Sequence, residues 1–179
     1  DLRSQAASTG ISPNLKGEDT TMAGPLRVGV VGIGQRGLQH VRSLTELQSD
    51  EIVNLAALAD PYTDNLDAAK INSFVPEYKD AGVKKFSSVR EMVDSGSVDA
   101  IWFVMPPNQH RGEIEYAAGK GIHIFAEKPQ SLWLDDVLRQ SEAIDRAGVL
   151  SMCGFQMRHD RGYTDIRNYL EGKWVASMT

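Results

Sequence analysis

The sequence contains a single cysteine, Cys153, among 179 residues. One thiol excludes an intramolecular disulfide framework and a zinc site built from several cysteines. It fits a reducing compartment, and we expect a cytoplasmic location. Long apolar stretches are also lacking, because the longest uninterrupted run, 100–105, is far shorter than the roughly 20 residues that span a bilayer. We therefore expect no membrane partner.

Basic residues are too few for a nucleic-acid binder. The chain has 19 Lys and Arg against 24 Asp and Glu, a formal net charge of −5, whereas phosphate neutralisation needs clustered cations. No His, Cys and carboxylate group shows metal-ligand spacing, so we expect no metal. The 41% hydrophobic and 24% charged residues are typical of a globular protein, and the length suits one ordinary domain.

The first 24 residues differ in composition from the rest of the chain. They are rich in Ser, Thr and Gly, and they lack both a helical period and the apolar core of a signal peptide. We interpret 1–24 as a flexible leader. An arm that packs on a partner subunit is the alternative, and composition leaves both open.

From Leu26 onward, short apolar runs alternate with amphipathic stretches, a pattern typical of a parallel sheet covered by helices. The pattern predicts an α/β fold of the Rossmann type, doubly wound and mainly parallel, over residues 25–155. We expect strands at 26–31, 52–59, around Phe86, and at 100–105, 122–126 and 149–155. The clearest helices are expected at 38–47, 108–118 and 131–147.

The last residues do not complete this domain. The segment 158–171 reads as a helix, Gly172 interrupts it, and 174–178 reads as a further strand. Because that strand has no obvious partner in the first sheet, we interpret 156–179 as the start of a second α/β domain.

The most specific motif is Gly32-Ile33-Gly34-Gln35-Arg36-Gly37, a G-x-G-x-x-G loop between a buried strand and an amphipathic helix. In this context the first glycine permits a tight turn, the second lets the backbone approach a pyrophosphate, and the third allows close packing of helix and strand. The helix start then offers free N–H groups to the phosphates. Arg36 either covers the pyrophosphate or points to solvent.

Asp60 ends the second expected strand, near the spacing of an acid that binds the adenosine ribose. A carboxylate there accepts hydrogen bonds from both ribose hydroxyls and repels a 2′-phosphate. Residues 61–64 hold no Lys or Arg to receive that phosphate, so we expect NAD rather than NADP. The alternative, an Asp-Pro turn, is favoured only if Asp60 is taken without the glycine loop.

Two further segments follow predicted strands, at the sheet edge where ligands bind in open α/β folds. They are 105–110, Met-Pro-Pro-Asn-Gln-His, and Glu127-Lys128-Pro129. Together with GIGQRG, AGKGIHIFAEKP and GFQMR, they make residues 26–178 resemble the glucose–fructose oxidoreductase / inositol dehydrogenase (Gfo/Idh/MocA) family.

The resemblance implies an NAD(P)-dependent oxidoreductase that transfers a hydride between a nicotinamide and a hydroxyl-bearing carbon of a sugar, polyol or related compound. It implies that Lys128 is the catalytic lysine, which hydrogen-bonds the reacting hydroxyl. It further implies cofactor contacts, in addition to those of residues 32–37 and Asp60, from Met105, Pro106, Asn108, His110, Glu127, Lys128 and Gln156. Without the resemblance, the Lys-Pro pair favours the alternative, a surface lysine before a proline that caps the next helix.

Members of that family carry a second domain that covers the substrate and often builds a homo-oligomer. Here only its expected start is present. Two interpretations follow. The chain is the nucleotide-binding portion of a dehydrogenase with a small-molecule substrate, or it is a non-catalytic NAD-binding or sensing module.

Overall fold

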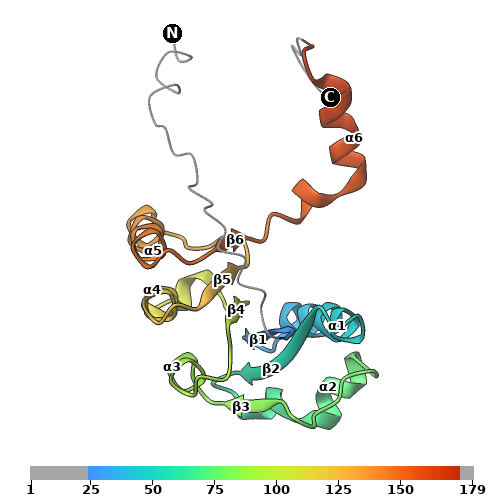
Figure 1. The fold of residues 1–179 in the computed structure, drawn as a ribbon, viewed down its shortest axis with the longest axis vertical. Helices are drawn as coiled ribbons and strands as arrows, with labels where there is room; N and C mark the ends of the chain where they lie inside the picture. The colour runs from blue at the N-terminus through green and yellow to red at the C-terminus, as the bar shows by residue number, and fades with distance from the viewer. Residues whose placement is uncertain (1–23, 174–179) are drawn as a thin grey trace.

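A computed structural model describes residues 24–173. Six parallel strands form one sheet in the order β3-β2-β1-β4-β5-β6 (Figure 1). Their bounds are β1 Leu26–Val31, β2 Val53–Ala59, β3 Lys84–Phe86, β4 Ala100–Phe103, β5 His123–Ala126 and β6 Ser151–Cys153. The strand order reverses between β1 and β4, and this is the point at which open α/β sheets bind ligands.

Helices cover both faces of the sheet (Figure 1). The α-helices are α1 Gln35–Ser49, α2 Ala68–Phe74, α3 Val89–Asp94, α4 Glu113–Gly119, α5 Leu134–Ala147 and α6 Arg161–Leu170. Short 3₁₀ turns lie at η1 Thr63–Leu66, η2 Pro107–Gln109 and η3 Gln156–His159. Since α1 and α2 lie on one face and α3, α4 and α5 on the other, the predicted doubly wound Rossmann-type fold is confirmed.

Each face has its own apolar core. On one face, buried residues of β1 and β2 pack against Val41 and Leu44 of α1 and Ile71 of α2. On the other, β4 and β5 pack against Met92 of α3 and Ile114 of α4. Strands buried on both sides account for the nearly continuous apolar runs in the sequence.

The predicted positions of the strands agree better with the structure than the predicted ends of the helices do. The helix expected at 108–118 begins only at Glu113, because Gly112 adopts a left-handed conformation (φ 95°), and it includes Gly119. The helix expected from 131 begins at Leu134, and the strands expected at 100–105 and 149–155 are confined to β4 and β6. The expected leader (up to residue 23) and the expected strand 174–178 lie outside the described residues.

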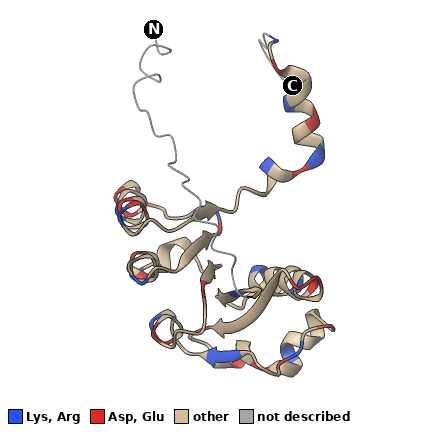
Figure 2. Cartoon of the chain, viewed as in Figure 1, with Lys and Arg blue, Asp and Glu red and all other residues tan. Residues whose placement is uncertain are grey.

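Helix α6 extends away from the sheet beyond β6 (Figure 1). It carries both basic and acidic residues along its length (Figure 2). Among them, Nε of Arg161 lies 3.9 Å from Oδ2 of Asp165. None of its described residues is buried, and Tyr163, Ile166 and Tyr169 are exposed. The assignment of 156–179 to a second domain stays a prediction.

Candidate functional site

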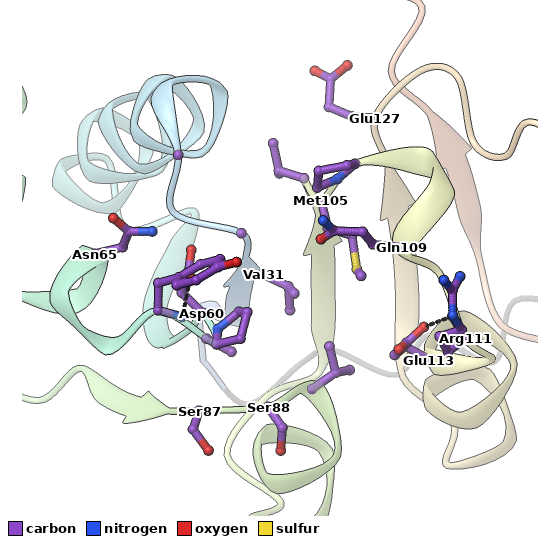
Figure 3. A pocket seen from close by; sticks show the side chains of 18 of the residues that line it. Val31, Asp60, Asn65, Ser87, Ser88, Met105, Gln109, Arg111, Glu113 and Glu127 are labelled. Carbon is purple, nitrogen blue, oxygen red and sulfur yellow. Dashed lines mark hydrogen bonds between the residues drawn. The ribbon is translucent and has the colours of Figure 1, made fainter.

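A cavity of about 800 Å³ opens at the carboxyl ends of the central strands. Its walls come from the glycine loop after β1, the residues after β2, the turn between β3 and α3, the segment after β4, and Glu127 and Lys128 after β5. Figure 3 shows Asp60 on one side and Met105, Gln109 and Glu127 on the other. The cavity therefore spans the point where the strand order reverses.

The three glycines of the loop have different surroundings. Gly32 has φ +87°, and a Cβ there would lie 2.6 Å from the carbonyl oxygen of Val104. A Cβ on Gly37 would lie 2.0 Å from the carbonyl oxygen of Gly32. At Gly34, by contrast, a Cβ would meet no described atom within 4 Å. Gly32 and Gly37 thus make the tight turn possible, while Gly34 leaves its side of the cavity open.

Helix α1 begins directly at this loop, with Gly34 as its N-cap residue. Among the described residues no side chain caps this end, and its first turn holds no acidic residue. The first N–H groups of a helix have no partner within the helix, and the helix dipole is positive there. This end of the cavity is therefore suited to an anion such as a diphosphate.

Asp60 connects the end of β2 to the glycine loop. Its side chain is buried (5% exposed), its Oδ2 accepts a hydrogen bond from the Ile33 N–H at 2.7 Å, and its Oδ1 accepts one from the Tyr62 N–H at 2.9 Å. Each carboxylate oxygen can accept a further bond, so Asp60 keeps acceptor capacity on the cavity side. The residue therefore serves the fold and remains available to a hydroxyl-bearing ligand.

Glu127 is the most connected side chain on the opposite wall. Its Oε1 lies 2.9 Å from Nε2 of His40 and 3.7 Å from Nε of Arg36, and its Oε2 accepts from the Lys128 N–H at 3.1 Å. Lys128 itself is exposed on the cavity wall. His40 is not among the residues expected from the sequence, where its place one helical turn after Arg36 is the available signal.

Nine of the residues expected from the sequence line the cavity, namely Gly32, Gly34, Gln35, Arg36, Asp60, Met105, Pro106, Glu127 and Lys128. Ile33 and Gly37 are buried residues of the glycine loop that do not line the cavity. Asn108, His110 and Gln156 do not line the cavity. Their cofactor contacts stay predictions.

His110 faces a second, smaller hollow between the start of α4 and helix α5. Its Nδ1 is buried and has no hydrogen-bond partner in the described part of the chain. Burial lowers the pKa of the His110 imidazole below its usual value. This environment favours a neutral ring that contributes to packing, since Phe103 lies with its ring centre 6.3 Å away.

Other lining residues were missed, including Tyr62, Asn65, Ser87, Ser88, Arg90, Gln109 and Arg111. Most lie in turns, and no fixed spacing connects them to the glycine loop. Arg90 lies over the ring of Tyr116, with its guanidinium carbon 4.0 Å from the ring centre. Only the folded sheet brings these segments together.

Within residues 24–173, no three His, Cys, Asp or Glu side chains are placed to hold a metal ion. No helix of that range is long and apolar enough to cross a bilayer.

Residues 26–155 match the model of an oxidoreductase family with an NAD-binding Rossmann fold, Gfo/Idh/MocA. Myo-inositol 2-dehydrogenase of Thermotoga maritima is 31% identical over 152 residues, which are 84% of this chain and 42% of that protein. The crystal structure of myo-inositol 2-dehydrogenase from Lactobacillus plantarum is similar, with a TM-score of 0.70 and 28% identity, over 82% of this chain and 41% of that one.

The crystal structure of the WlbA dehydrogenase from Bordetella pertussis, in complex with NADH and UDP-GlcNAcA, is also similar. Its TM-score is 0.70 at 26% identity, over 82% of this chain and 43% of that one. This chain thus spans about two fifths of the length of such relatives. The matched residues include the glycine loop, Asp60 and the Glu127–Lys128 pair, and the chain belongs to the Gfo/Idh/MocA family of oxidoreductases with an NAD-binding Rossmann fold.

Proposed function

We propose that this chain is the nucleotide-binding portion of an NAD-dependent oxidoreductase that acts on a hydroxyl-bearing carbon of a polyol or sugar. The observation that carries the proposal is the buried Asp60 carboxylate bonded to the glycine loop beside an open cavity. The inositol dehydrogenases among its relatives support the substrate class. A homo-oligomer and a cytoplasmic location stay predictions.

The residues present fit NAD. The bare backbone at Gly34 and the uncapped start of α1 suit the diphosphate, and the spare acceptor capacity of Asp60 suits the adenosine ribose. Residues 61–64 hold no cation for a 2′-phosphate, which supports NAD over NADP. When bound, the nicotinamide supplies the hydride acceptor or donor. Met105 and Pro106 form the cavity wall after β4.

Lys128 is the proposed catalytic residue. It follows β5, at the carboxyl edge of the sheet, and its exposed side chain lines the cavity. Oxidation of an alcohol makes the hydroxyl proton more acidic as the hydride leaves, so a group that hydrogen-bonds this proton lowers the barrier. In this role the Lys128 Nζ orients the hydroxyl and takes part in the movement of its proton.

Calorimetric titration with NAD and NADP tests the cofactor proposal. We expect NAD to bind more tightly, because the Asp60 carboxylate repels a 2′-phosphate; equal or reversed affinities contradict it. Where turnover of a polyol is measurable, Lys128→Ala lowers kcat far more than cofactor affinity. Lys79→Ala, at an exposed lysine outside the cavity, is the control. Because the family's second domain covers the substrate, turnover is measured in the complete enzyme, and NAD binding there without turnover of any polyol or sugar favours the non-catalytic module instead.

A further inference from the structure

His40 is held in an aromatic slot beneath the cavity. The imidazole of this α1 residue meets Trp102 of β4 with ring centres 5.1 Å apart and Phe125 of β5 with ring centres 5.4 Å apart, in edge-on contacts. Trp102 and Phe125 contact each other at 4.7 Å. Only 16% of the His40 side chain is exposed. Packing of this kind restricts the imidazole to one orientation.

The His40 imidazole directs one N–H at a single carboxylate. A carboxylate only accepts hydrogen bonds, so Nε2 of His40 is the donor to Oε1 of Glu127 at 2.9 Å. Arg36 faces the same oxygen from a longer distance, 3.7 Å. On another side lies Gly154, where a Cβ would come within 3.3 Å of the Glu127 carboxyl carbon. The carboxylate is thus confined from several directions.

The second carboxylate oxygen of Glu127 connects this side chain to the backbone of Lys128. Oε2 of Glu127 accepts the backbone N–H of Lys128 at 3.1 Å. An ordered imidazole therefore fixes a carboxylate, and the carboxylate fixes the backbone of the lysine. In a two-halved Rossmann sheet the β1–β3 half receives one nucleotide and the β4–β6 half the other. With the adenosine at Asp60, this connection lies at the nicotinamide end.

We propose that His40 is a positioning residue that acts through Glu127 to fix Lys128 at the nicotinamide end of the cleft. This inference rests on the proposed function. It assigns His40 no contact with the cofactor or the substrate.

Two substitutions separate the N–H donor from the ring. His40→Phe keeps an aromatic ring in the slot and removes the donor. His40→Gln loses the ring and keeps an N–H donor the same number of bonds from Cα as Nε2. Comparing the binding of NAD and ADP-ribose distinguishes the two ends of the cleft. ADP-ribose has the diphosphate and both riboses of NAD but no nicotinamide. Backbone amide hydrogen exchange at Lys128 reports the positioning without any activity assay.

In His40→Phe we expect the Lys128 amide to exchange about tenfold faster and the Kd for NAD to rise about three- to tenfold, the range of one typical net hydrogen-bond contribution. The Kd for ADP-ribose should change by less than about twofold, since that ligand lacks the nicotinamide that would lie beside Glu127 and Lys128. His40→Gln should restore most of both values. Thermal unfolding of each variant is the folding control, and His40→Leu, which also removes the N–H donor, replaces His40→Phe in both measurements if the latter does not fold.

Unchanged exchange at Lys128 in His40→Phe overturns the inference. An equal loss of NAD and ADP-ribose affinity also overturns it, because that result indicates general damage to the domain. If the wild-type chain binds neither nucleotide, the proposed function fails, and exchange at Lys128 alone decides the positioning claim.

Discussion

Two glycines of the same loop should respond to alanine in opposite ways. In Gly37→Ala the new methyl carbon would lie 2.0 Å from the carbonyl oxygen of Gly32. Ordinary carbon–oxygen contacts begin near roughly 3.3 Å, so the loop and α1 must separate by about 1.3 Å. The obstructing atom belongs to the backbone, and no side-chain rotation can relieve the contact.

The effect of Gly37→Ala on the free energy of unfolding combines two opposing contributions. Overpacking costs about 1–3 kcal/mol, while alanine inside a helix is favoured over glycine by about 1 kcal/mol. The backbone clash belongs at the upper end of the first range, which leaves a net loss of about 1–2 kcal/mol. For a chain of this size, that loss lowers Tm by about 2–8 °C.

Gly34→Ala should leave Tm unchanged, because its methyl group would meet no described atom within 4 Å and its extended backbone (φ −79°) suits any residue. The methyl group instead occupies the proposed diphosphate position, and NAD affinity should fall by at least about tenfold. Thermal unfolding without nucleotide, paired with calorimetric titration of NAD, measures both effects. A Gly37→Ala chain that unfolds like the wild type, or a Gly34→Ala chain that binds NAD with unchanged affinity, would contradict these expectations.

Three further substitutions test other parts of the molecule. Asp60→Ala deprives two backbone N–H groups of their acceptor and should destabilise the nucleotide-free chain by about 2–4 kcal/mol, measured by denaturant unfolding; a loss of NAD affinity alone would show that Asp60 has no structural role. The Arg27 guanidinium lowers the pKa of Asp99, so its stabilisation is present above the unfolded pKa of about 3.9 and is lost as pH falls through the folded value. Asp99→Asn should therefore cost about 0.5–1 kcal/mol at pH 7 for this partly exposed pair, and a difference that persists at pH 2 would contradict the assignment. Burial raises the pKa of the Cys153 thiol, so iodoacetamide should alkylate the folded chain more slowly than the urea-unfolded chain at pH 8, and equal rates would contradict this.

Much of the fold could be predicted because burial on both faces leaves a visible pattern. The first two strands were placed within one residue of β1 and β2. The error after β4 has a local cause: Pro106 and Pro107 support a short 3₁₀ turn, and Gly112 then adopts a left-handed conformation before α4 begins. The pattern of apolar residues predicts α4 itself, but it does not indicate the left-handed Gly112 that delays the start of the helix.

Some residues of the candidate site could likewise be predicted from the sequence, and others could not. The glycine loop and Asp60 could be predicted because a strand, a turn and a helix fix their spacing in the chain. The partnership of His40 with Glu127 could not, since the two residues are 87 positions apart and meet only when β1 and β5 flank β4. The same holds for Ser88 and Arg90, which reach the cavity from the start of α3, directly after the edge strand β3.

The decisive experiment is a crystal structure of the chain with NAD bound. We predict a dinucleotide across the carboxyl ends of β1 and β4, with its diphosphate at the backbone of residues 32–37, its adenosine ribose on Asp60 and its nicotinamide beside Glu127. A nucleotide bound elsewhere on the sheet, or an adenosine ribose without contact to Asp60, would contradict the account.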